Sequence, residues 1–200
     1  MMLANPHDDL FSWHQHCRFS ATTKGFIEKF GVRVILQGRN IFDTVVSFRD
    51  HLVTIGSCQA MAYADDSFAL FFEQRQLDFV IDLVVPWYLN FYCSWFAARA
   101  QGEIDYFYVG YEDLFSDPQA MLRGILKFLG ESRSEQEIQN AIAMAPEVGR
   151  EVWGPGPGGG TRFNVGTIGR GDATLSVDQK ERIRHLGHYY AHIDLSPIGF

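Results

Sequence analysis

Runs of apolar and polar positions divide the chain into segments of two periodicities, and together they predict an α/β fold. Short β-branched and aromatic runs at 32–36 and 106–109 are typical of buried strands. Apolar positions at helical spacing, several of them bounded by capping residues, predict the helices. The predicted helices cover 42–62, 67–77, 86–99, 118–129, 134–145 and 176–190. Because the strands are separated by helices, the strands are expected to pair in a parallel sheet.

The segment 86–99 is unusual because it is apolar nearly all round, which predicts a helix packed on several sides. It belongs to the longest apolar stretch, Phe79–Phe96, which Asp82, Pro86 and Asn90 interrupt. These interruptions favour a buried helix over a membrane span.

Composition places the chain among ordinary globular proteins. Its 200 residues, 46% of them hydrophobic, suffice for one core, so we expect a single domain over 1–200. A net charge of −7 excludes a broad electrostatic surface for nucleic acid. Cys17, Cys58 and Cys93 are widely spaced, which predicts neither a metal site nor a disulfide framework and favours a reducing, cytoplasmic compartment.

Candidate chemistry lies where the first predicted strand meets its helix. Arg39 follows the strand, and Ser47 lies one helical turn beyond Asp43 on the same predicted face. Strand ends and helix N-termini bind phosphates, and a guanidinium with a nearby hydroxyl suits that ligand. The alternative interpretation is a strand-end arginine paired with a surface carboxylate.

Two motifs carry a resemblance to a known family. The first is Arg39-Asn40-Ile41-Phe42-Asp43 followed by Ser47, and the second is Tyr111-Glu112-Asp113-Leu114 followed by Phe128-Leu129-Gly130. Over about 14–190 the chain resembles the cytosolic-type sulfotransferases.

The resemblance implies a three-layer α/β fold of the P-loop NTPase-like type, with a central parallel sheet. It also implies 3′-phosphoadenosine 5′-phosphosulfate (PAPS) as donor and a small-molecule or glycan hydroxyl as acceptor. Arg39 and Ser47 would then hold the 3′-phosphate. The sequence leaves the acceptor and the oligomeric state open.

A glycine-rich loop at 151–171 resembles the family's nucleotide-closing loop. Gly166 and Gly169 match its glycine pair. Asn164-Val165 stand where the family has Arg-Lys, so Arg162 or Arg170 is expected to supply the missing positive charge.

The family's first strand and its lysine-bearing phosphosulfate loop have no counterpart. The first glycine is Gly25, and no Gly-Lys-Thr cluster occurs. Because that loop hangs from a central strand in the family, its loss predicts a hole in the middle of the sheet. The chain is therefore expected to be a sulfotransferase or, alternatively, a non-catalytic remnant or fragment that acts as a nucleotide-binding or interaction module.

His16 lies 23 residues before Arg39, where the resemblance implies the general base that takes the acceptor's proton. His14 fits that spacing less well. The other interpretation is a solvated or structural His-Gln-His segment, and a metal site formed with Cys17 lacks a further ligand.

Two further groups have both structural and functional interpretations. Glu112 and Asp113 form a carboxylate pair, for which hydrogen bonds that fix the neighbouring loop are favoured over acid–base chemistry. Phe68, Phe71 and Phe72 would line an acceptor pocket, but aromatic residues at helical spacing more often belong to the core.

Overall fold

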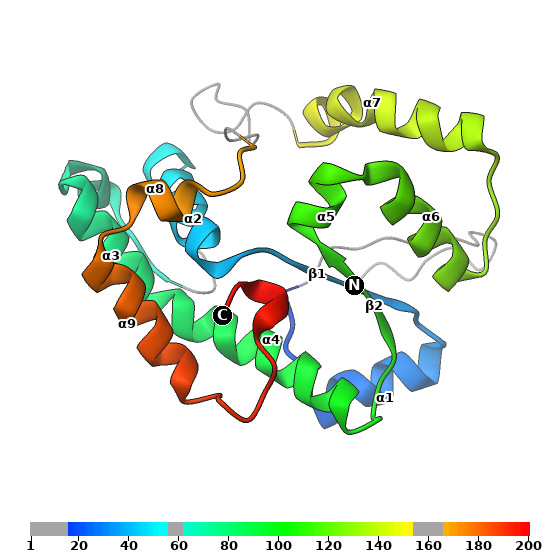
Figure 1. Cartoon of the computed structure of the whole chain (residues 1–200), viewed down its shortest axis with the longest axis horizontal. Coiled ribbons are helices and arrows are strands. Elements are labelled where there is room, and N and C mark those ends of the chain that lie inside the picture. The colour runs from blue at the N-terminus through cyan, green and yellow to red at the C-terminus, as the bar shows by residue number, and fades with distance from the viewer. Residues whose placement is uncertain (1–15, 56–61, 154–165) are drawn as a thin grey trace.

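The computed structural model describes residues 16–55, 62–153 and 166–200 and has a mixed α/β fold that is mostly helical (Figure 1). Its elements in chain order are α1 (Ala21–Phe30), β1 (Val34–Gly38), α2 (Ile41–Ile55), the 3₁₀ helix η1 (Asp66–Leu70), α3 (Glu73–Leu83), α4 (Val85–Ala100), β2 (Tyr106–Gly110), α5 (Tyr111–Ser116), α6 (Pro118–Leu129), α7 (Glu135–Trp153), α8 (Arg170–Thr174), α9 (Val177–His188) and η2 (Ser196–Ile198).

Both predicted strands are confirmed, and most predicted helices lie close to their expected positions. The predicted helix 67–77 is instead a 3₁₀ turn followed by α3, and α7 continues well past residue 145. The predicted continuation of α2 over 56–61 lies outside the described residues.

Helices α1, α5 and α8 were not predicted. α1 has ordinary boundary signals, since the Ser20 hydroxyl accepts from the backbone N–H of Thr23 and Gly31 ends the helix in the left-handed region. α5 begins at the residue after β2, so the predicted strand-end motif is the first turn of a helix.

The two strands pair directly and in parallel, in a register that runs from Val34↔Tyr106 to Gly38↔Gly110. The expected hole in the middle of the sheet is therefore wrong for the part of the chain that the structure describes. The N–H and C=O groups of β1 that face β2 are therefore paired with β2 and leave no gap between the two strands.

Helices cover both faces of this strand pair. Side chains alternate along β2, so Tyr108 contacts Phe96 of α4 on one face while Phe107 contacts Phe128 of α6 on the other. The small parallel sheet is compatible with the sulfotransferase fold, whereas the full three-layer P-loop arrangement stays a prediction.

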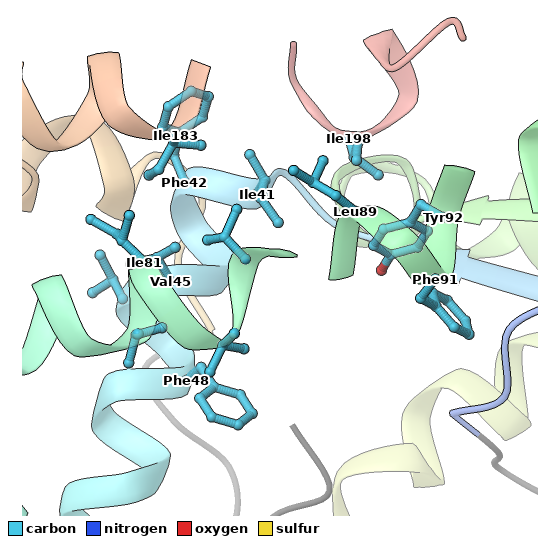
Figure 2. Packing of buried hydrophobic residues seen from close by; sticks show 14 of the residues in the cluster. Ile41, Phe42, Val45, Phe48, Ile81, Leu89, Phe91, Tyr92, Ile183 and Ile198 are labelled. Atoms are coloured by element: carbon cyan, nitrogen blue, oxygen red, sulfur yellow. The ribbon is translucent and has the colours of Figure 1, made fainter. Parts of the chain in front are cut away.

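The main core lies where α2, α3, α4 and α9 meet (Figure 2). Ile41 and Val45 of α2 are fully buried against neighbouring helices, together with Ile81, Leu89 and Ile183. The carboxyl end of β1 is thereby joined to a helix that is anchored along its length.

Helix α4 is packed on several sides, as predicted, and has buried residues all round its axis. Together α3 and α4 form one stretch, Glu73–Ala100, that is long and apolar enough to cross a membrane. Of its most apolar window 56% is buried inside the fold, and core helices of soluble proteins meet the same criterion.

The last residues of the chain lie at the carboxyl ends of the strands. The Tyr108 hydroxyl donates to the carbonyl oxygen of Pro197 over 2.7 Å, and Ile198 is fully buried. Gly199 has φ +91° and packs so closely against Asn40 that a Cβ there would lie 2.3 Å from the Asn40 amide nitrogen. This segment therefore supports the turn between β1 and α2.

Candidate functional site

The turn between β1 and α2 is fixed by Asn40. Its side-chain oxygen accepts hydrogen bonds from the backbone N–H groups of Phe42 (2.9 Å) and Asp43 (3.3 Å), so Asn40 caps α2. The backbone N–H of Asn40 itself donates to Glu112 over 3.1 Å. Glu112 thus fixes the neighbouring loop, which is the structural role predicted for it.

Arg39 precedes this cap, and three groups hold its guanidinium. One terminal nitrogen donates to the carbonyl oxygen of Thr167 (3.2 Å) and lies 3.9 Å from a carboxylate oxygen of Asp43, while the Tyr111 ring lies 4.4 Å below the guanidinium carbon. The side chain is 19% exposed. Its Nε is buried and has no hydrogen-bond partner among the described residues.

These contacts differ from those of an arginine in a simple surface ion pair. An arginine that forms a strong ion pair with a carboxylate makes short, bidentate hydrogen bonds. The 3.9 Å distance between Arg39 and the Asp43 carboxylate is longer than a hydrogen bond. A buried N–H without a partner costs free energy, which an anion placed beside Arg39 would recover.

The glycine loop lies against this turn, although more than a hundred residues separate the two segments. The backbone N–H groups of Gly169 (2.8 Å) and Gly171 (2.7 Å) donate to the Asp43 carboxylate. Gly166 and Gly169 have positive φ, +63° and +83°. Gly169 of the predicted pair therefore lies against the Arg39 turn, and Gly166 directly precedes Thr167, which contacts Arg39.

The two candidate replacement arginines have different outcomes. Arg162 lies outside the described residues, as does His14. Arg170 forms an ion pair with Asp50 of α2 at 2.6 Å, and both side chains are about one-fifth exposed. It therefore lies along α2, next to the glycine loop.

Ser47 is half-buried on α2, one turn beyond Asp43. Since residues four apart share a helix face, Asp43 and Ser47 lie in a row that continues from Arg39. Among the residues that the structure describes, the Ser47 hydroxyl makes no hydrogen bond.

His16 is exposed and lies beside the first half of α4. Its ring is 5.8 Å from that of Trp87 and 6.5 Å from that of Phe91. Further along α4, Trp95 contacts Tyr106 at the start of β2, so Trp87 and Phe91 lie toward the carboxyl ends of the strands. The next residue, Cys17, accepts a hydrogen bond from the Trp95 indole N–H over 3.0 Å, so the segment 16–17 follows α4, and the described contacts do not join His16 to Arg39.

Tyr92 was not recognised from the sequence. Its hydroxyl donates to the carbonyl oxygen of Gln37 over 3.3 Å, two residues before Arg39. Burial raises the pKa of Tyr92, and burial also raises the pKa of Tyr88, to about 12. Both phenols stay neutral at physiological pH, and Tyr92 acts as a hydrogen-bond donor to the end of β1, a role that the aromatic pattern of α4 alone did not reveal.

The three phenylalanines have separate environments. Phe68 is buried and Phe71 packs against the core, which confirms the core interpretation for both. Phe72 is 69% exposed.

Two surface pockets among the described residues lie away from Arg39 and Ser47. One, of about 370 Å³, lies between α3 and α9 and is lined by Asp82, Glu181, Arg182, His185 and Leu186. The other, of about 270 Å³, lies among β2, α5 and α6 and includes Asp113. The described lining of both excludes Arg39 and Ser47, so the arrangement at the strand ends is a separate site.

No metal-binding group of three or more histidine, cysteine or acidic side chains is found among the residues that the structure describes. The positively charged Arg39 and the hydrogen-bond donors at the strand ends suit an anion instead.

Comparison with known families gives one match. A family model described as "Sulfotransferase domain" matches residues 2–145, which include β1, β2 and the Arg39 turn. A search of curated proteins gives no match.

Proposed function

The chain belongs to the sulfotransferase domain family, and from that premise we propose that it transfers the sulfuryl group of PAPS to a hydroxyl acceptor. The family supports sulfuryl transfer in general. The donor, the acceptor class and the residue roles given below are parts of the proposal.

The observation that carries the proposal is the state of Arg39. Its guanidinium is mostly buried, stacked on Tyr111 and oriented by Thr167, yet its Nε has no partner among the described residues. A phosphate oxygen beside this nitrogen would receive a charge-assisted hydrogen bond, which contributes about 1.5–3 kcal/mol. We assign this place to the 3′-phosphate of the nucleotide.

Ser47 and the glycine loop complete the proposed phosphate subsite. The Ser47 hydroxyl adds a donor further along α2, and Gly166 and Gly169 let the loop backbone approach the nucleotide closely. Arg162 is proposed as a second cation from the same loop.

His16 is the proposed general base. As the acceptor oxygen bonds to sulfur, the bond from sulfur to the phosphate oxygen breaks and adenosine 3′,5′-bisphosphate leaves. The hydroxyl proton passes to the imidazole, a step typically worth about 10²–10⁴-fold in rate.

A specific observation also favours a second candidate, a nucleotide-binding module without transfer activity. The family's lysine-bearing loop has no counterpart in the sequence, and β1 and β2 pair directly where the strand carrying it would lie. No side chain is then assigned to stabilise charge on the leaving phosphate.

Titration with adenosine 3′,5′-bisphosphate, followed by calorimetry, tests the phosphate subsite. Arg39→Ala should weaken binding about 10- to 100-fold, because one charge-assisted bond is lost. Arg75→Ala is the matched control, since that guanidinium also lies over an aromatic ring, at 4.2 Å from Phe71. Absence of binding to the unmodified protein at millimolar nucleotide would contradict both candidates.

Transfer of labelled sulfate from PAPS to a panel of phenol, alcohol and sugar acceptors separates the two candidates. The enzyme predicts turnover that His16→Ala abolishes while nucleotide affinity stays unchanged. Nucleotide binding with no turnover on any acceptor would support the module, and equal loss of binding and turnover in His16→Ala would make His16 structural.

A further inference from the structure

Asp43 carries a buried negative charge next to the proposed anion site. The residue is 2% exposed, in the first turn of α2. A buried carboxylate is stable only when hydrogen bonds or opposite charges compensate it. Its presence beside a site that we assign to a phosphate therefore needs a physical reason.

The two carboxylate oxygens of Asp43 have different partners. One accepts from the Gly171 N–H at 2.7 Å, and the other accepts from the Gly169 N–H at 2.8 Å and faces the Arg39 guanidinium at 3.9 Å. Thr167, from the same loop, accepts from Arg39. The carboxylate thus joins the glycine loop to the arginine through a closed set of contacts.

Close packing accompanies these hydrogen bonds. A Cβ added at Gly171 would lie 2.5 Å from the Phe42 carbonyl carbon and 2.8 Å from the Asp43 nitrogen, so the backbones of α8 and α2 are in direct contact. Figure 1 shows α8 lying alongside α2. The loop is consequently held at a fixed distance from Arg39.

We propose that Asp43 is a positioning residue that holds the glycine loop and the Arg39 guanidinium in their nucleotide-binding arrangement. This inference rests on the proposed function for its ligand. The Asp43 carboxylate accepts its hydrogen bonds from two backbone N–H groups. It therefore orients the Arg39 guanidinium and leaves the hydrogen-bond donors of that guanidinium available for a ligand. Order in the loop and affinity for the nucleotide are then coupled through one carboxylate.

The first test is hydrogen exchange at the Gly169 and Gly171 amides, with adenosine 3′,5′-bisphosphate as the probe. Asp43→Asn leaves one accepting oxygen and puts an NH₂ group where the other accepts, so exchange should accelerate about tenfold or more. Nucleotide affinity should fall about tenfold.

Asp172→Asn is the matched control. It removes the same charge one residue from Gly171, but this carboxylate is 86% exposed and pairs with Lys180 at 3.1 Å. Both the exchange rates and the nucleotide affinity should stay within about twofold of the unmodified protein.

A double-mutant cycle separates positioning from a general structural role. If Asp43 acts through Arg39, Asp43→Asn should weaken binding much less in an Arg39→Ala background, because the two effects are not additive. Equal effects in both backgrounds would overturn the proposal.

A further experiment tests the coupling in the unmodified protein, without a substitution at Asp43. Saturating nucleotide should slow exchange at Gly169 and Gly171 in the unmodified protein, and unchanged rates in a protein that binds the nucleotide would overturn the coupling. If the proposed function is wrong, the result differs: the unmodified protein binds no nucleotide, but Asp43→Asn still accelerates exchange at the two glycine amides.

Discussion

The corner where α2 meets α8 and the pair formed by α6 and α7 are both held by charged side chains, but in opposite environments. At the corner, Asp43 is buried and accepts from backbone amides, and Arg170 and Asp50 are only about one-fifth exposed. Between α6 and α7, Arg123 and Glu135 form their 2.6 Å contact with about half of each side chain exposed.

The difference shows where polar contacts fix geometry. α6 has no fully buried residue. Because water solvates both members of its exposed charge pair, the pair contributes little to stability. The buried corner has no such freedom, because each polar group loses water and must keep its protein partner. Precise geometry, and with it ligand binding, is expected at the corner.

The largest effect is expected from a methyl group added at the corner. Gly171→Ala places its Cβ 2.5 Å from the Phe42 backbone, which cannot move away without shifting α2. Overpacking of this kind should destabilise the protein by about 1–3 kcal/mol. Urea denaturation followed by circular dichroism measures the change.

Gly25→Ala is the control for that substitution. Gly25 lies in α1 with nothing within 4 Å of an added Cβ, so alanine there should stabilise the protein by about 0.5–1 kcal/mol. Equal effects at the two glycines would mean that α8 does not pack closely on α2.

A smaller effect is expected at the start of α6. The Asp117 side chain accepts from the Ala120 N–H over 2.9 Å and caps the helix. Asp117→Ala should cost about 1 kcal/mol, read from the shift in denaturation midpoint. Asp117→Ser, which keeps a capping oxygen, should recover most of that loss; no recovery would assign the effect to charge rather than to the cap.

The smallest effect concerns Glu135. Hydrogen bonds from Arg123 and then Gln119 lower the pKa of Glu135 from 4.5 to about 2. Because the folded pKa is depressed, the pair's contribution to stability is present above pH 4.5 and is lost as the pH falls toward 2, and solvent around the exposed pair keeps this contribution small. NMR titration of the Glu135 carboxyl measures it.

Glu135→Gln should leave the melting temperature nearly unchanged at pH 7, since the pair is exposed. A melting temperature that falls as far as that of Gly171→Ala would contradict the contrast between the two regions.

Local patterns explain which elements the sequence predicted. The β-branched run before Arg39 and the Asp117, Pro118 and Gly130 signals around α6 depend on neighbours within a few residues, and the structure bears out the elements they predict. Helix α1 was missed although Ser20 caps it, because its apolar positions are few and none is buried.

The site depends on contacts that no local pattern encodes. In the sequence Asp43 is only one member of the Arg39 motif, and its contacts could not be predicted because Gly169 and Gly171 lie more than 120 residues away. The expected hole in the sheet was wrong for a related reason, since strand pairing is decided by the whole fold. The resemblance to the family directed attention to Arg39, but only the structure shows what orients it.

The direct pairing of β1 with β2 has a consequence for reconstitution. Any strand that inserts between β1 and β2, from a separately added segment, has to open a ladder of five residue pairs first. Insertion would therefore be slow and limited by this opening, with a rate that no longer rises with the concentration of the added segment once that concentration is high.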